Sequence, residues 1–205
     1  MTEHEKMLSG KYYNGMDPQL CEIHNRCKDL CFAYNQLLPS QKSQARELMR
    51  KILAKTGEHF LIMSPFWCDY GIHTSIGEHF FANHNCVILD CGEVTFGDHV
   101  FIGPNCGFYA ATHPIASGLR EVDVEYAKPI HVGSHVWFGG GVQVCPGVTI
   151  GSHVVIGAGS VVTSDIPDGV IAVGNPCRIL RSLTPKEMQE SLTPAQILER
   201  IEKQP

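Results

Sequence analysis

The histidines of this chain have the clearest capacity for acid–base chemistry, because an imidazole changes its charge near neutral pH. The chain has eleven of them. His113 stands apart, in the stretch Ala-Ala-Thr-His-Pro at residues 110–114, because no repeated pattern accounts for it. A histidine there suits a general base that takes a proton from a hydroxyl group, and it equally suits a turn fixed by the neighbouring proline. The residues alone leave both interpretations open.

Other reactive side chains form no catalytic motif. The sequence has no Gly-x-Ser-x-Gly stretch, no P-loop and no Cys-x-x-Cys pair. Its nine cysteines are odd in number and lack the spacing of a disulfide framework, so we expect buried, reduced thiols. We expect no metal cofactor.

A period of six residues organises the second half of the chain. An apolar residue recurs every six positions, usually followed by glycine or another small residue. This period fits neither an amphipathic helix nor a simple hairpin, and it predicts a parallel β-helix whose triangular coils each hold three hexads and stack at about 4.8 Å. The inward positions of this block are Val132, Phe138, Val144, Ile150, Ile156 and Val162.

The repeat begins earlier and is then interrupted. Hexads run from Tyr70 to Ile88 and, after two extra residues, from Phe96 to Phe108. From Thr112 to Pro129 the pattern is absent. A long irregular loop within a regular scaffold often carries function, so we place the chemistry at residues 112–129.

Five histidines share one hexad position, three residues after an inward residue, where a polar side chain faces solvent at a turn. Asn85 and Asn105 occupy the same position. We interpret these histidines as corner residues, because no carboxylate or cysteine completes a metal site around them. The spacing predicts that His135 stacks on His153, and that His79 stacks on His99 if the two extra residues bulge outward. The five are His73, His79, His99, His135 and His153.

The N-terminal part has a helical pattern. A short helix is expected from Glu3 to Ser9. Asp17 can cap a second helix, with Pro18 at its first position, that runs to about Leu38. Ser40 can cap a third helix that ends near residues 56–57. We divide the chain into a helical module at 1–58, a β-helix at 59–182 that contains the loop 112–129, and a polar tail at 183–205 with a helix expected at about 194–203.

Composition excludes several classes of function. The net charge is −5 and no run of lysine and arginine is present, which argues against a nucleic-acid partner. No apolar run approaches the ~18 residues of a membrane span, and the first residues lack the apolar core of a signal peptide. We therefore expect a cytoplasmic protein without a membrane partner.

Several stretches together resemble the maltose and galactoside O-acetyltransferases. They are GKYYNGMDPQL at 10–20, CDYGIHTSIGEHFFANHN at 68–85, ATHP at 111–114, the hexad block at 129–167 and GNPCRIL at 174–180. The resemblance extends over roughly residues 3–182. It implies a left-handed parallel β-helix, mainly β in class, with a small helical N-terminal module. It also implies acetyl-CoA as acyl donor and a homotrimer whose active sites lie between neighbouring coils.

By this resemblance, His113 is the general base that takes the proton from a sugar hydroxyl as its oxygen attacks the thioester carbonyl. Attack would be direct, because no activated serine or cysteine is evident. Asn83 would lie in the active site and contact the acceptor sugar, since it matches the family's active-site asparagine. Asp17, which also suits a helix cap, and Asp69 match acceptor-binding positions, and Glu125 and Tyr126 are expected to close over the acceptor.

For coenzyme A, the resemblance implies contacts from the coil edge and from two arginines that suit its phosphates. The glycine run 139–141 can present a backbone N–H to the oxyanion. The chain departs from the family at Ser164, where a lysine is common, at Gly140, where galactoside enzymes have serine, and at Cys91, where they have aspartate. Asp90, beside Cys91, is the carboxylate available to replace it. The coenzyme residues are Gly140, Ala158, Thr163, Ser164, Arg178 and Arg181.

The predicted function is an acetyl-CoA-dependent O-acetyltransferase acting on a sugar such as maltose, glucose or a galactoside. One alternative is an antibiotic or aminosugar acetyltransferase, which the helical module at 1–58 disfavours. Another is a non-catalytic or metal-binding β-helix such as a γ-type carbonic anhydrase.

Overall fold

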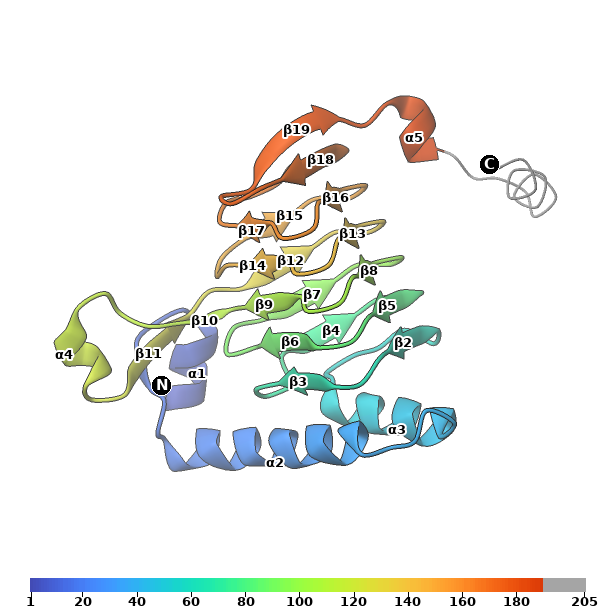
Figure 1. Cartoon of the computed structure of the whole chain (residues 1–205). Helices are drawn as coiled ribbons and strands as arrows, with labels where there is room; N and C mark the ends of the chain where they lie inside the picture. Colours follow the sequence, from blue (N-terminus) through green and yellow to red (C-terminus); the bar gives the residue numbers. More distant parts are fainter. Residues whose placement is uncertain (190–205) are drawn as a thin grey trace.

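The structure, a computed structural model, describes residues 1–189, which form a triangular parallel β-helix with helices across one end (Figure 1). This confirms the predicted architecture. Strands pair in parallel from coil to coil, except that β19 returns antiparallel to β18. The seven-stranded face contains β2 (Phe60–Ile62), β5 (Phe80–Ala82), β8 (Phe101–Ile102), β13 (Trp137–Phe138), β16 (Val155–Ile156), β18 (Val170–Val173) and β19 (Arg178–Ser182). The five-stranded face contains β3 (Phe66–Cys68), β6 (Cys86–Leu89), β9 (Gly107–Tyr109), β14 (Gln143–Val144) and β17 (Val161–Val162). The four-stranded face contains β4 (Thr74–Ile76), β7 (Val94–Phe96), β12 (Ile130–Val132) and β15 (Thr149–Ile150).

The chain visits the three faces in a fixed order, which creates three corners. The glycine corner joins the seven-stranded to the five-stranded face and holds Asn83, Gly140 and Ala158. The arm corner joins the five-stranded to the four-stranded face and holds Asp69 and residues 113–129. The histidine corner leads back to the seven-stranded face.

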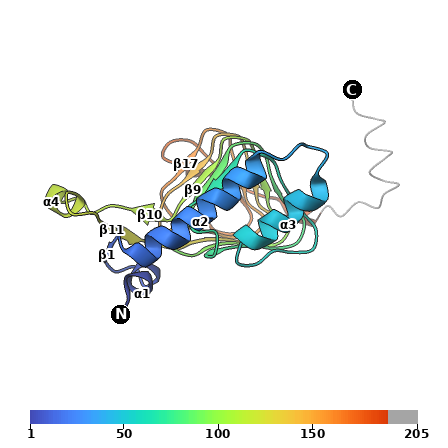
Figure 2. The same ribbon diagram turned by 90° about the horizontal axis from the view of Figure 1, so that it is seen from below.

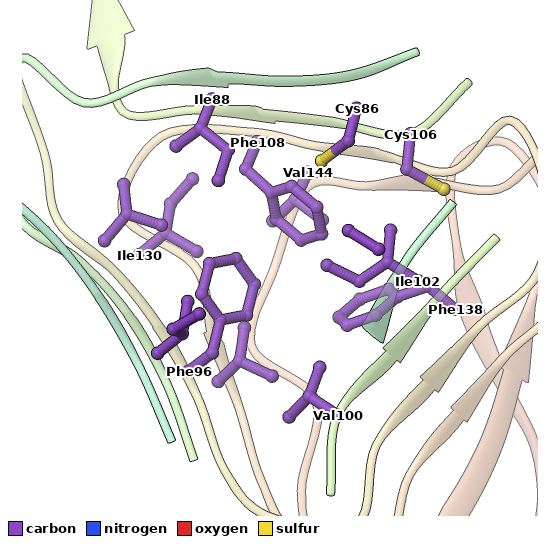
Figure 3. Close-up of a cluster of buried hydrophobic side chains, with 14 of the residues drawn as sticks. Cys86, Ile88, Phe96, Val100, Ile102, Cys106, Phe108, Ile130, Phe138 and Val144 are labelled. Atoms are coloured by element: carbon purple, nitrogen blue, oxygen red, sulfur yellow. The ribbon is translucent and has the colours of Figure 1, made fainter. Parts of the chain in front are cut away.

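The core of the β-helix is a column of inward apolar side chains (Figure 3). Phe108 packs edge-on against Phe96 and Phe138, with ring centroids 4.9 and 5.2 Å apart. All three rings are buried. Because the interior is filled by side chains, chemistry must take place at the corners.

Coil length changes along the column. Register places Phe60 beside Phe80, twenty residues on, but Trp137 beside Val155, eighteen residues on. The sequence pattern revealed the extra residues in only one coil; the register shows them in two. They widen the arm corner within segments 68–76 and 88–96.

The histidine corner contains a ladder of imidazoles. His79, His99, His135 and His153 have φ between 53° and 58°, the left-handed turn conformation that histidine tolerates better than most residues. Their rings stack coil upon coil at centroid separations of 4.8–4.9 Å. The predicted stacks are confirmed, and His59 extends the ladder below His79 at 5.3 Å.

His73 does not belong to this ladder, and its prediction as a solvent-facing corner residue was wrong. The widened turn places it at the arm corner, where it is buried. Its Nδ1 lies 2.7 Å from the carbonyl oxygen of Asp90, and its Nε2 lies 2.9 Å from Nε2 of His4.

The helical module consists of α1 (Glu3–Leu8), α2 (Pro18–Asn35) and α3 (Lys42–Ile52), and α2 and α3 cross the lower end of the column (Figure 2). Asp17 caps α2 as predicted, accepting the N–H groups of Gln19 and Leu20 at 3.1 and 3.2 Å. Helix α2 ends at Asn35 rather than near Leu38. The Asn35 side chain instead bonds both the N–H and the carbonyl group of Phe66, at 2.8 and 2.9 Å.

Helix α3 is shorter at both ends than predicted. Its N-cap is Gln41 rather than Ser40, and the Gln41 side chain accepts the N–H of Leu38 at 2.8 Å instead of capping the helix. The helix ends at Ile52 rather than near residues 56–57, because the N–H of Ala54 bonds carbonyl groups of the first coil.

Residues 112–129, predicted as an irregular loop, form an ordered arm that projects from the column (Figure 1). The arm contains α4 (Ser117–Arg120) and β11 (Val124–Ala127). Strand β11 pairs antiparallel with β10 (Ala111–Thr112) on one side and with β1 (Tyr13–Asn14) of the helical module on the other. The hexad pattern could not reveal this sheet, because its period differs from that of the coil.

The described chain ends in α5 (Pro185–Gln189), after β19. The helix expected at about 194–203 lies outside the described residues. In residues 1–189, no helix combines the length and the apolar character that crossing a membrane requires.

Candidate active site

His113 follows β10 directly, where the arm leaves the coil. Its side chain is exposed, whereas Pro114 behind it is buried. Arg120 braces the chain just beyond, since its guanidinium donates to the carbonyl oxygens of Pro114 and Ile115 at 2.7 and 2.6 Å. Within residues 1–189, no group hydrogen-bonds the His113 imidazole. The ring is therefore held on a fixed segment with both nitrogens available to a substrate.

Glu125 on β11 is oriented by Tyr13 of the helical module. The Tyr13 hydroxyl donates to Oε2 of Glu125 at 2.6 Å. Burial is the main reason that the pKa of Tyr13 lies far above its usual value, so the phenol stays a neutral donor. Tyr126, next along β11, packs edge-on against Tyr12 with ring centroids 5.6 Å apart.

Asp69 lies in the turn after β3 and is held by α2. Its Oδ1 accepts a hydrogen bond from Lys28 Nζ at 2.8 Å and lies 3.5 Å from Nε2 of His24. The thiol of Cys91 lies 3.8 Å from its Oδ2. Burial opposes the charge of Lys28, but the hydrogen bond and charge of Asp69 outweigh it and raise the pKa of Lys28. Lys28 therefore keeps its positive charge beside Asp69, whose Oδ2 is the freer oxygen.

Asp90 does not substitute for the missing aspartate at Cys91. It is fully buried. Its Oδ1 accepts the N–H of Tyr70 at 2.8 Å, and its Oδ2 accepts the hydroxyl of Thr74 at 3.0 Å. Asp90 therefore shapes the widened turn and is not available to an acceptor.

A second apolar cluster lies at the arm corner, and two of its members, Tyr13 and Cys91, contact the predicted acceptor residues Glu125 and Asp69. Tyr70, which the hexad pattern placed in the coil, belongs to this cluster. Burial, and then the charges of Cys91, Glu125 and Asp69, raise the pKa of Tyr70. The cluster residues are Met7, Tyr13, Leu20, Tyr70, Cys91 and Ala127.

Asn83 lies at the glycine corner, a different edge of the column from the arm corner that holds His113. It is partly exposed. Its Oδ1 accepts the N–H of His84 at 2.8 Å, which leaves the amide nitrogen of its side chain free to donate. The structure of one chain therefore does not bring Asn83 and His113 into one site.

Gly140 lies two coils above Asn83 at the same corner. The N–H groups of Gly139 and Gly141 donate to backbone carbonyls at 2.8 Å, whereas that of Gly140 has no acceptor in the described part of the chain. Ala158 follows on the next coil and is exposed. This corner therefore presents an unbonded amide on a surface with small side chains.

The other predicted coenzyme residues lie at the upper end of the column. Thr163 and Ser164 are exposed in the turn after β17, and Arg178 and Arg181 are exposed on β19. Arg181 forms a two-point ion pair with Glu187, at 3.0 and 2.7 Å, which lowers the pKa of Glu187 to about 2. In the described part of the chain, the guanidinium of Arg178 bonds only a backbone carbonyl.

Two positioning residues were missed by the sequence analysis. Lys28 holds Asp69, and its spacing of four from His24, which places both on one side of α2, was an available signal. Tyr13 holds Glu125 across 112 residues of chain, and no local pattern could indicate that contact.

The chain is similar to known acetyltransferases. Residues 6–57 match the family described as "Maltose acetyltransferase hexapeptide capping motif", and residues 129–164 match "Bacterial transferase hexapeptide (six repeats)". A Saccharomyces cerevisiae protein assigned to the acetyltransferases is 45% identical over 184 residues, which cover 89% of this chain and 94% of the relative.

Two solved structures are similar over most of their length. A maltose O-acetyltransferase from Clostridium difficile 630 superimposes with a TM-score of 0.89 at 43% identity, covering 90% of this chain and 98% of that one. A galactoside acetyltransferase in complex with coenzyme A gives a TM-score of 0.88 at 37% identity, covering 95% and 97%. The column is thus a left-handed β-helix, as predicted. The chain belongs to the maltose and galactoside O-acetyltransferase family of hexapeptide-repeat acetyltransferases.

Proposed function

We propose that this acetyltransferase transfers the acetyl group of acetyl-CoA to a hydroxyl of a sugar, with His113 as the general base. One observation carries the proposal: the imidazole is exposed and unbonded on a braced segment, at the corner that also holds the oriented carboxylates of Asp69 and Glu125. The names of the two solved relatives support a sugar as acceptor.

The transfer needs only groups that this chain supplies. His113 takes the hydroxyl proton as the sugar oxygen attacks the thioester carbonyl, and such a base contributes roughly 10²–10⁴-fold to the rate. The N–H of Gly140 stabilises the negative charge on the carbonyl oxygen. When the C–S bond breaks, the His113 imidazolium returns its proton to the coenzyme thiolate.

The acceptor would be held by oxygen acceptors at the arm corner. Asp69 offers Oδ2, and Glu125 offers Oε1 while Tyr13 occupies Oε2. Carboxylates accept hydrogen bonds from the hydroxyl groups of a sugar. Asp17, whose Oδ1 caps α2, and Tyr126 lie on the same module and arm and complete this group.

Acetyl-CoA is the donor, as the coenzyme A complex of the galactoside acetyltransferase supports. The residues of the upper column fit it. Gly140 and Ala158 leave room for the extended chain of the coenzyme. Thr163 and Ser164 offer hydroxyl groups to it. Arg178 offers an exposed guanidinium for a phosphate. Arg181 would first have to leave Glu187.

We further propose a homotrimer in which His113 of one subunit meets Asn83 and Gly140 of its neighbour. The separation of these residues within one chain supports this assembly. The seven-stranded face supports it as well, because its outward residues form an apolar stripe. Leu61, Phe101 and Trp137 in this stripe are 51%, 47% and 56% exposed, and Phe81 pairs with two of them.

The test is release of free coenzyme A thiol from acetyl-CoA by the purified protein against maltose, glucose, a galactoside and an amino sugar. We expect release with at least one neutral sugar and an ester product by mass spectrometry. Release with the amino sugar alone, giving an amide, would contradict the proposal.

A further inference from the structure

Three buried thiols converge where the helical module meets the first coil. Cys27 and Cys31 lie one turn apart on α2 and face Cys68 at the end of β3. Their Sγ atoms lie 3.4 and 3.8 Å from that of Cys68, and all three lie within 4.8 Å of one another. In the part of the chain that the structure describes, no other group of histidine, cysteine and acidic residues is this compact.

The spacing of these sulfur atoms matches that of sulfur ligands around one metal ion. A metal–sulfur bond of about 2.3 Å places the sulfurs about 3.8 Å apart in a tetrahedral site and about 4.0 Å apart in a trigonal one. The cysteines therefore need only small rotations to hold a common ion. Apolar side chains without sulfur at these three positions could not bind a metal ion.

Within the described chain, the residues around the three thiols offer no fourth ligand, which favours an ion that binds with three. The three residues are at most 2% exposed, so their sulfur atoms are shielded from solvent and a water ligand is disfavoured. Asp90 lies nearby, but both of its oxygens already accept hydrogen bonds. Structural zinc sites have four ligands, whereas soft thiolates also select Cu(I), which accepts three.

We propose that Cys27, Cys31 and Cys68 form a site for a thiophilic cation with three sulfur ligands, namely Cu(I) or the As(III) of arsenite. Each thiol releases its proton as its bond to Cu(I) forms. With arsenite, As(OH)3, each new As–S bond replaces one As–O bond, and the thiol proton leaves with that hydroxyl group as water. For a monovalent ion, the ammonium of Lys28, 3.0 Å from the carbonyl oxygen of Cys68, offsets part of the remaining negative charge. The site ties α2 to β3, and Cys27 and Cys68 directly precede Lys28 and Asp69 in the chain.

The test is a titration of the purified protein with Cu(I) against a chromophoric Cu(I) chelator, and separately with arsenite. We expect one tightly bound ion per chain and a shell of three sulfurs in X-ray absorption, a measurement that requires no variant. Binding to the folded chain should also raise the Tm. A wild-type protein that binds neither ion, or binds them with two sulfurs, would overturn the proposal. If only one of the two ions binds, that result identifies the cation.

Matched variants locate the site. Cys27→Ala and Cys68→Ala should lower the affinity for the ion by at least about tenfold, because each removes a ligand. Cys86→Ala removes an equally buried thiol from the coil and should leave the affinity unchanged. Equal binding by Cys27→Ala and Cys86→Ala would refute the assignment. Far-UV circular dichroism and the urea midpoint of each variant report that it has folded.

Discussion

Lys28 Nζ on α2 donates to Asp69 Oδ1 at the arm corner, at a distance of 2.8 Å. The two side chains are 32% and 16% exposed, so the pair is partly shielded from water. This contact joins the helical module to the first coil. It leaves Asp69 Oδ2, which lies 3.8 Å from the Cys91 thiol, as the oxygen open to an acceptor. It therefore links the stability of the module to the shape of the candidate site.

Lys28→Met should lower the stability of the protein and weaken acceptor binding. The variant keeps the aliphatic stem but leaves the Asp69 carboxylate without its main partner, and we expect a loss of about 1–2 kcal/mol in the free energy of unfolding, after allowing for partial exposure. Urea unfolding measures this loss, and KM for the acceptor should rise. Lys51→Met, on the exposed side of α3, is the control. Equal effects of the two variants would refute the role of the pair.

His113→Ala should abolish most of the activity without destabilising the fold. Removal of a general base is expected to lower kcat by roughly 10²–10⁴-fold. Because the side chain is exposed, the urea midpoint should not change. His59→Ala, at another exposed histidine, should retain full activity. A His113→Ala variant with more than about a tenth of the wild-type kcat would exclude the base assignment.

A mixture of two inactive variants should recover activity. If His113 of one subunit acts with Asn83 of its neighbour, trimers refolded from equal amounts of His113→Ala and Asn83→Ala chains should contain intact sites in about a quarter of positions. Acetyl transfer by the mixture measures this recovery. A chain that carries both substitutions, mixed with His113→Ala, is the control and should stay inactive. No recovery in the first mixture would place both residues in one subunit.

Ser164→Lys should tighten coenzyme binding. A lysine in this exposed turn would add one ion pair with a phosphate, worth about 0.5–1 kcal/mol, or about two- to fivefold in KM for acetyl-CoA. Ser164→Gln matches the length without the charge and should change little. An unchanged KM in Ser164→Lys would show that no phosphate lies at this turn.

The histidine ladder should make stability fall in mild acid. Partial desolvation within the stack, and then His153 and His99, lowers the pKa of His135, while Asp98 opposes the shift. The unfolded chain therefore binds protons more readily, so stability is lost as the pH falls below the unfolded value of about 6.5. Asparagine occupies the same hexad position at Asn85, so His135→Asn should be tolerated. This variant should reduce the decline in Tm between about pH 7.5 and about pH 5.5. His113→Asn, outside the ladder, should not reduce it.

Local sequence was informative wherever one residue type recurs at one position of the coil. The six-residue period identified the β-helix, the inward column and four of the five predicted corner histidines. Asp17 and Pro18 identified the start of α2. The helix ends were less predictable, because Asn35 and Ala54 bond groups of the first coil that lie far away in sequence.

The sequence by itself thus determined the scaffold, because each hexad repeats the same inward and turn positions. Only the tertiary structure decided which of the residues outside the repeat come into contact. Two extra residues in each of two coils widened the arm corner, drew His73 into the interior and let Asp69 reach Lys28. Pairing across 112 residues brought Tyr13 to Glu125, and docking of α2 brought Cys27 and Cys31 to Cys68. These contacts depend on the path of the whole chain, which no local pattern contains.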